Sequence, residues 1–278
     1  MTIKSDINWV NPRTLEHESL THTEPTDVPQ VVEQARMSGI HWSQMTLNER
    51  ADRIIKLGRM ITTRREEGAE LLAQETGRAS SMLSLSELNH VLTFISACIK
   101  EAKYALKPTK VKLSPLDWPG KSVRVEQVPR GVIGIIAPWN YPISNFYKSL
   151  FPALLAGNTV VIKPSEFTPR VGAWLAEVAR EALGEGIVNC VQGGAAVGGA
   201  LIDAGIDAIV FTGSVKTGEK VAIAAAKQLI PCSLELGGKD AALVLADAEI
   251  ERSALGIAQW SMFNSGQDCS SIERLYIV

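Results

Sequence analysis

Val132-Ile133-Gly134-Ile135-Ile136 is a continuous apolar run that leads directly into Ala137-Pro138-Trp139-Asn140. An apolar run without a polar face is typical of a strand that is buried on both sides of a sheet. Four similar short runs follow, separated by stretches with helical spacing: Val160-Val161-Ile162, Ile187-Val188, Ala208-Ile209-Val210-Phe211 and Ser233-Leu234. This alternation predicts an α/β fold in which helices cover both faces of a parallel sheet.

The chain before this sheet has a different pattern. Residues 1–27 are polar, and we expect an extended arm that contributes little to the core. From Val28 to about Leu106 apolar residues recur with helical spacing, which predicts several packed helices. Val111-Lys112-Leu113 and Val123-Arg124-Val125 alternate apolar and polar residues, so they predict a hairpin that projects from the domain. Within the sheet region, Thr168-Pro169 predicts a helix start, with Thr168 as the N-cap.

Composition excludes several classes of protein. The 278 residues are 46% hydrophobic and 21% charged, with a formal net charge of −2, as in an ordinary soluble globular protein. Lys and Arg do not form basic runs, so nucleic acid is not an expected partner. The sequence has neither a long uncharged apolar stretch nor the apolar core of a signal peptide. We therefore expect a cytoplasmic protein that does not bind a membrane.

The four cysteines, Cys98, Cys190, Cys232 and Cys269, are far apart and form no C-x-x-C pair. A disulfide framework or a zinc site is therefore not expected, and we predict no metal site. All four histidines precede residue 100, away from the apparent site, although sequence distance alone leaves a Cys/His hydrolase open.

Cys269 is the cysteine for which the sequence suggests a chemical role. It follows the turn Phe263-Asn264-Ser265-Gly266, and Glu235 lies upstream in Leu234-Glu235-Leu236-Gly237-Gly238-Lys239. A thiolate is a strong nucleophile and a carboxylate can activate water. This pair suits chemistry that passes through a thioester.

Polar side chains follow two successive predicted strands, Asn140 after the first, and Lys163 and Glu166 after the second. Ligands of open α/β sheets bind beyond the carboxyl ends of strands, so both loops can face one cleft. Asn140 can donate to an oxyanion, and the two charged residues can contact ribose hydroxyls. The alternatives are a turn built on prolines and a surface charge pair.

Phe211-Thr212-Gly213-Ser214 ends a third strand and leads into a helix, where backbone N–H groups can meet a pyrophosphate. Its glycines do not form G-x-G-x-x-G, so this signal is weak alone. Spacing from this turn would place Glu235 on a ribose. In the next helix after Asn140, Ser144 and Lys148 share one face and predict either a polar pocket wall or a solvated surface.

Taken together, these motifs resemble NAD(P)-dependent aldehyde dehydrogenases over residues 28–278. The motifs that carry the resemblance are Pro138-Trp139-Asn140, Lys163-Pro164-Ser165-Glu166, Phe211-Thr212-Gly213-Ser214, Glu235-Leu236-Gly237-Gly238-Lys239 and Gly266-Gln267-Asp268-Cys269. The resemblance implies a dinucleotide-binding domain over residues 1–240, with an oligomerisation hairpin at 110–128, and the start of an α/β catalytic domain at 241–278. It also implies an aldehyde substrate, NAD as cofactor with NADP as the alternative, and a homo-oligomer.

The resemblance also implies residue roles. Cys269 is the nucleophile, Glu235 the base that activates water, and Asn140 with the Cys269 backbone N–H the oxyanion hole. Glu166, and not Glu235, becomes the ribose carboxylate, which favours NAD over NADP. The positions implied to contact the cofactor are Ile136, Pro138, Trp139, Lys163, Ser165, Glu166, Phe211, Thr212, Gly213, Ser214, Leu236 and Gly237. The glycine pairs at 193–194 and 198–199 are interpreted as packing positions.

Two features depart from the family pattern. Val215 stands where members commonly have threonine, and members are almost twice as long. The additional part would supply most of the catalytic domain, the E-x-F glutamate and the strand that docks onto a neighbouring subunit. We therefore expect this chain to need a C-terminal complement for turnover. The run Arg274-Leu275-Tyr276-Ile277-Val278 predicts a terminal strand, and because no turn or partner strand follows it, its apolar edge is expected to be exposed.

Two other functions remain open at this point. One is a non-catalytic protein that binds nucleotide or serves as an assembly partner. The other is an acylating dehydrogenase that transfers the thioester to coenzyme A, although a water-activating Glu235 favours hydrolysis.

Overall fold

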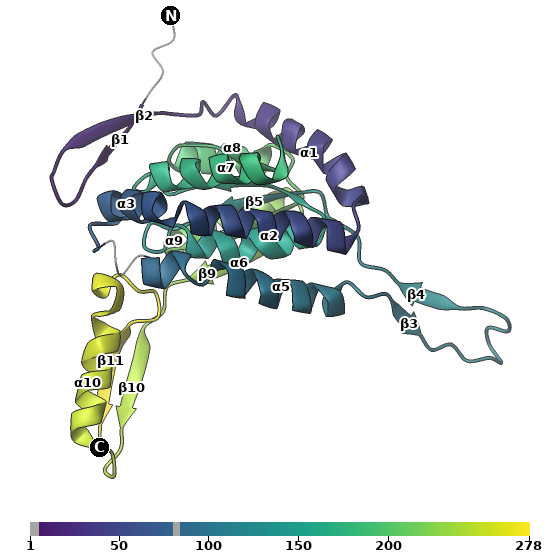
Figure 1. Cartoon of the computed structure of the whole chain (residues 1–278). Coiled ribbons are helices and arrows are strands. Elements are labelled where there is room, and N and C mark those ends of the chain that lie inside the picture. Colours follow the sequence, from purple (N-terminus) through teal and green to yellow (C-terminus); the bar gives the residue numbers. More distant parts are fainter. Residues whose placement is uncertain (1–5, 80–83) are drawn as a thin grey trace, which may run out of the picture.

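The computed structural model describes residues 6–79 and 84–278, and a five-stranded parallel sheet lies at its centre (Figure 1). All five predicted strands are confirmed. In spatial order they are β7 (Val188–Cys190), β6 (Thr159–Lys163), β5 (Val132–Ile136), β8 (Ala208–Gly213) and β9 (Cys232–Leu236). Every residue of β5 and β6 is buried, as their continuous apolar runs predict.

The strand order reverses between β5 and β8. The chain runs from β5 outward through β6 to β7, and then returns to the other side of β5 to form β8 and β9. Ile136 pairs with Lys163 on one side and with Phe211 on the other, so the three strands end together. Such a switch point opens a crevice at the carboxyl edge of a sheet, where ligands bind.

Helices cover both faces of the sheet, as predicted. Ile133 and Ile135 of β5 pack in one apolar core, and Val132 and Ile136 pack in the other, because successive strand side chains alternate. The first core holds α2 (Leu47–Thr63), α3 (Arg65–Thr76), α5 (Val91–Ala105), α6 (Ser144–Leu155) and α7 (Pro169–Leu183). The second holds α1 (Val28–Gln44), α8 (Ala195–Asp203) and α9 (Val215–Lys227).

The prediction for the N-terminal arm was wrong in part. Strands β1 (Asp6–Val10) and β2 (His17–Thr21) form an antiparallel hairpin. Ile7 and Trp9 are buried, and the Arg170 guanidinium lies 5.6 Å from the centre of the Trp9 ring. The polar composition of the arm hides this alternation, in which every second residue faces the protein.

The projecting hairpin is present, but its first strand begins earlier than predicted. Strand β3 (Thr109–Val111) pairs with β4 (Val123–Val125), and all residues of both strands are exposed. The hairpin extends away from the helices that surround the sheet (Figure 1). Lys112 and Leu113, which were predicted to lie in the first strand, belong to the loop because pairing starts at Thr109 opposite Val125.

Helix α7 begins at Pro169 as predicted, but its cap comes from elsewhere. The Thr168 side chain accepts no capping hydrogen bond. Instead, the Glu75 carboxylate accepts from the backbone N–H groups of Arg170 at 2.7 Å and Val171 at 3.0 Å. Burial raises the pKa of Glu75 to about 8, although these two donors act in the opposite direction.

This buried carboxyl predicts a pH-dependent stability. The folded chain keeps a proton on Glu75 up to a pKa of about 8, whereas the unfolded chain releases it near the ordinary value of 4.5. The stability contributed by this proton is therefore complete below that ordinary pKa and declines as the pH rises toward 8. Because of Glu75, the unfolding free energy of the wild type should fall by up to about 1.4 kcal/mol for each pH unit in this range. Glu75→Gln should abolish this contribution to the fall.

Urea unfolding at a series of pH values measures that slope. The matched control is Glu70→Gln on the same helix, where the side chain is exposed. Equal slopes for wild type and Glu75→Gln would contradict the prediction, whatever their absolute stabilities.

Residues after β9 form a separate β-α-β unit. Strands β10 (Asp240–Val244) and β11 (Ile272–Ile277) pair in parallel, and they are connected through α10 (Ile250–Ser261) and the short helix η2 (Phe263–Gly266). The terminal strand pairs with β10 on one edge, and its residues from Glu273 to Ile277 are exposed. No residue of α10 is buried, and Leu255 and Met262 are largely exposed. The division of the chain between residues 240 and 241 stays a prediction.

Over the described parts of the chain, no helix combines the length and apolar character needed to cross a bilayer. The remaining helical element, η1 (Ser84–Leu88), is a single π-helical turn beside α3 and α6.

Candidate functional site

A cavity of about 850 Å³ extends along α6 and one face of the sheet to the carboxyl edge, and the three predicted catalytic side chains line it. Asn140 comes from the loop after β5, Glu235 from β9, and Cys269 from the loop before β11. The structure therefore brings together a thiol, an amide and a carboxylate from three separate segments. Their catalytic roles stay predictions.

Cys269 differs from the other three thiols in its surroundings. Its side chain is exposed, whereas Cys98, Cys190 and Cys232 are only partly accessible. Burial raises the pKa of Cys98 and Cys232, and it raises the pKa of Cys190 to about 12 even though Lys163 acts in the opposite direction. A thiol with a raised pKa is rarely ionised and reacts slowly, which leaves Cys269 as the accessible thiol that lines the cavity.

The Asn140 amide is held by the loop that carries Cys269. Its Nδ2 donates to the Gln267 carbonyl at 2.9 Å, and the backbone N–H of Gly238 donates to the Cys269 carbonyl at 3.3 Å. An amide nitrogen carries two hydrogens, so Asn140 keeps one for an oxyanion. This geometry suits a donor that is fixed in place before charge develops.

Glu235 lies on the edge strand of the sheet. It pairs with Thr212 of β8, and its side chain is exposed in the cavity wall. An exposed carboxylate can accept a proton from a water molecule that enters the cavity.

A second cavity, of about 430 Å³, lies on the other side of the same loops. Both cavities are lined by a shared partition, which consists of Pro138, Trp139, Thr212, Gly213 and Ser214. Ser214 caps α9 by accepting from the Thr217 N–H at 3.3 Å, so the start of this helix faces the second cavity. Helix N-termini favour anions such as phosphates.

Lys163 and Glu166 line the second cavity together. The Lys163 side chain is almost completely buried, and its Nζ donates to the Pro164 carbonyl at 2.8 Å and lies 3.7 Å from the Glu166 carboxylate. Burial lowers the pKa of Lys163, although Glu166 acts in the opposite direction. The Glu166 side chain is half exposed and can accept from a hydroxyl in the cavity.

Ten of the twelve predicted cofactor positions line this second cavity, and Leu236 and Gly237 instead line the first. The sequence analysis missed several further wall residues: Phe167, Gly194, Gly198, Gly199, Thr217 and Lys220. The glycine pairs were the available signal, because Gly194, Gly198 and Gly199 all line this cavity. A Cβ at Gly198 would make only ordinary van der Waals contact with the Lys163 side chain, at 3.6 Å. In the first cavity, Lys148 is accompanied by Ser149 and not by Ser144.

Comparison with known proteins identifies the family of this chain. The model of the aldehyde dehydrogenase family matches residues 2–278. The chain is 35% identical over its whole length to 4,4'-diapolycopene aldehyde oxidase of Methylomonas sp., covering 52% of that protein. It is 36% identical to 2-hydroxymuconic semialdehyde dehydrogenase of Pseudomonas sp. strain CF600 over 85% of this chain and 49% of the relative.

A solved structure agrees. The NAD+ complex of aldehyde dehydrogenase from Bacillus cereus matches with a TM-score of 0.91 and 29% identity, over 98% of this chain and 56% of that one. The chain thus spans about half the length of the relatives it matches. Both the fold and the sequence show that the chain belongs to the aldehyde dehydrogenase family.

Proposed function

We propose that the protein oxidises an aldehyde to a carboxylic acid, with Cys269 as the nucleophile and NAD as the hydride acceptor. The observation that carries the proposal is the convergence of Cys269, Asn140 and Glu235 on one cavity that shares a partition with a second cavity. Aldehyde oxidation needs two such compartments, one for the substrate and one for the acceptor.

The chemistry follows from the three side chains. The Cys269 thiolate adds to the aldehyde carbon, and the resulting oxyanion accepts hydrogen bonds from the Asn140 amide and the Cys269 backbone N–H. Loss of hydride from this carbon leaves a thioester on Cys269. Glu235 then takes a proton from water, the hydroxide adds to the thioester carbon, and the C–S bond breaks to release the acid and the thiolate.

The second cavity fits a dinucleotide. Nicotinamide would supply the acceptor for the hydride when bound, and the half-exposed Glu166 would accept from ribose hydroxyls. The N-terminus of α9 and the wall glycines would approach the pyrophosphate without side-chain obstruction. Val215 removes a hydroxyl at this turn but no backbone donor.

Assembly and location are also part of the proposal. The exposed hairpin formed by β3 and β4 would contact a second subunit in a homo-oligomer, and the protein would act in the cytoplasm. A non-catalytic protein that only binds nucleotide is the second candidate. NADH formation from an aldehyde, together with acylation of Cys269, tests the first candidate against the second.

The cofactor proposal predicts an effect of Glu166. A carboxylate at this position accepts from the ribose 2′-hydroxyl but repels a 2′-phosphate. Glu166→Gln should weaken NAD binding and strengthen NADP binding, with a change in the affinity ratio of roughly tenfold, about 1.4 kcal/mol. Fluorescence titration can measure both affinities, since Trp139 lines the cavity and is 43% exposed.

The matched control is Glu185→Gln, which removes an exposed carboxylate that pairs with Arg180. The assignment would be contradicted if the wild type bound NAD and NADP with equal affinity and Glu166→Gln left that ratio unchanged.

A further inference from the structure

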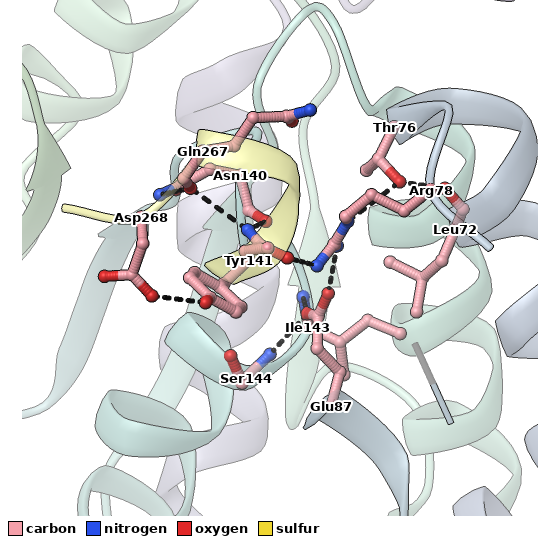
Figure 2. Close-up of polar contacts among 11 residues, drawn as sticks. Leu72, Thr76, Arg78, Glu87, Asn140, Tyr141, Ile143, Ser144, Gln267 and Asp268 are labelled. Carbon is pink, nitrogen blue, oxygen red and sulfur yellow. Dashed lines mark hydrogen bonds and ion pairs between the residues drawn. The ribbon is translucent and has the colours of Figure 1, made fainter. Parts of the chain in front are cut away.

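A buried ion pair lies next to the loop that carries Cys269. The Arg78 guanidinium is 2.5 Å from the Glu87 carboxylate, and the two side chains are 3% and 0% exposed. Arg78 also donates to the Thr76 hydroxyl at 3.2 Å, and its guanidinium lies 5.5 Å from the centre of the Tyr141 ring. Figure 2 shows this cluster between α3 and the Asn140 loop. Burial of two charges is costly unless every polar atom is satisfied, so the pair calls for a physical explanation.

Glu87 connects the pair to the helix that follows Asn140. Its second carboxylate oxygen accepts from the backbone N–H groups of Ile143 at 2.9 Å and Ser144 at 3.2 Å (Figure 2). These groups belong to the start of α6 and have no partner within the helix. Burial raises the pKa of Glu87, while Arg78 and the two N–H donors act in the opposite direction. Glu87 thus fixes the distal end of the Asn140 loop.

Arg78 connects the pair to the turn before Cys269. Its guanidinium donates to the Asn264 side-chain oxygen, and the Asn264 Nδ2 donates to the Asn140 carbonyl and the Gln267 carbonyl, both at 3.0 Å. The Asn264 side chain is buried, and both its oxygen and its nitrogen form hydrogen bonds. The Gln267 carbonyl also accepts from Asn140 Nδ2 at 2.9 Å.

This turn has an unfavourable backbone. Asn264, Ser265 and Gly266 are consecutive left-handed residues, with φ of 55°, 61° and 73°. The left-handed conformation costs a non-glycine residue roughly 1–2 kcal/mol. The turn therefore needs external contacts to persist, and Arg78 supplies one of them through Asn264.

We propose that Arg78 is a positioning residue, which holds the left-handed turn against the Asn140 loop and so sets the distance between Cys269 and the Asn140 amide. The proposal rests on the proposed nucleophile and oxyanion hole. Arg78 does not line the cavity with Cys269, and its contacts reach the two loops through Asn264, Glu87 and the Tyr141 ring. Without Arg78, the Cys269 thiol stays accessible but is no longer held at a fixed distance from the Asn140 amide.

Two thiol reagents separate these effects. Acylation by p-nitrophenyl acetate passes through a tetrahedral oxyanion and releases p-nitrophenolate, whereas alkylation by iodoacetamide displaces iodide without an oxyanion. Both rates are proportional to the fraction of Cys269 present as thiolate, so this fraction cancels from their ratio at each pH. A misplacement of about 1 Å should slow acylation roughly a hundredfold. The ratio therefore reports the geometry of the oxyanion hole and needs no cofactor.

Three variants of the purified chain test the proposal. Arg78→Ala removes the positioning contact, and Asn264→Asp keeps an acceptor for Arg78 but loses the donor to Asn140 and Gln267. Arg50→Ala is the control, because Arg50 is a buried arginine that donates to the Leu155 carbonyl at 3.0 Å, at the opposite end of α6. Peptide mapping assigns each modified cysteine, and exposure of Cys98 and Cys232 reports unfolding.

We expect Arg78→Ala and Asn264→Asp to lower the acylation-to-alkylation ratio of Cys269 roughly a hundredfold and Arg50→Ala to leave it unchanged. A cavity of about 340 Å³ lined by Arg78, Asn264 and Ser265 could admit a guanidinium ion. Recovery of acylation in Arg78→Ala by low-millimolar guanidinium would support positioning over a role in folding.

A wild-type ratio in folded Arg78→Ala overturns the proposal, and so does a wild-type ratio in Asn264→Asp if Arg78→Ala unfolds. A wild-type chain in which Cys269 is not acylated overturns the proposed nucleophile instead, so the two failures are distinguishable.

Discussion

Cys269→Ser is expected to lower aldehyde oxidation at least about a thousandfold, because a hydroxyl at this position is far less ionised and less nucleophilic than a thiol. The same variant should lose the fast phase of iodoacetamide labelling. The reason is structural: Cys269 is exposed in the cavity, while burial raises the pKa of the other three thiols. NADH formation by the protein and peptide mapping of limited alkylation measure the two effects.

Cys98→Ser is the control for Cys269→Ser, because Cys98 lies on α5 away from the cavity. Activity and fast labelling should both persist in it. Preferential labelling of Cys190 or Cys232 in the wild type would contradict the assignment of the nucleophile.

The second large effect is expected at Glu235. Glu235→Gln removes the base for water but leaves Cys269 and Asn140 in place, so acylation should proceed and hydrolysis of the thioester should slow roughly 10²–10⁴-fold. p-Nitrophenyl acetate should then release one equivalent of p-nitrophenolate, followed by almost no turnover. Intact mass should show a single acetyl group, and peptide mapping should place it on Cys269.

Glu251→Gln on the exposed helix α10 provides the comparison for Glu235→Gln. Rapid hydrolysis of the thioester by Glu235→Gln would exclude Glu235 as the base. Clearance of the wild-type thioester by coenzyme A, and not by water, would support an acylating dehydrogenase.

The sequence predicted the central sheet because its strands are buried on both faces. Val132–Ile136 and Thr159–Lys163 have no exposed position, and each contains a continuous apolar run, Val132–Ile136 in the first and Val160–Ile162 in the second. The β1–β2 hairpin was missed for the opposite reason. Ile7 and Trp9 are the buried residues that the structure describes in these two strands, and the exposed residues around them make the segment look like a polar arm.

The cavity residues were predictable where a strand end carries them. Lys163 ends strand β6, Asn140 and Ser214 follow the ends of β5 and β8, and the register of the sheet brings these strand ends to one edge. Contacts between distant segments gave no comparable signal. Arg78 and Asn264 are separated by 186 residues, and Glu75 caps α7 from 95 residues away, without any local pattern that links the partners.

The two cavities share a partition, so a substitution in it affects both of them. This partition consists of Pro138, Trp139, Thr212, Gly213 and Ser214. A bulkier residue on this wall takes volume from both sides, and a smaller one gives volume to both. Under the proposed function, a substitution at one of these positions should change substrate range and dinucleotide affinity together. By reciprocity, a ligand in one cavity that displaces Trp139 changes the affinity of the other cavity by the same factor in either order of binding. Independent adaptation to a new aldehyde should instead arise at walls that only the larger cavity has, such as Lys148 and Ser149.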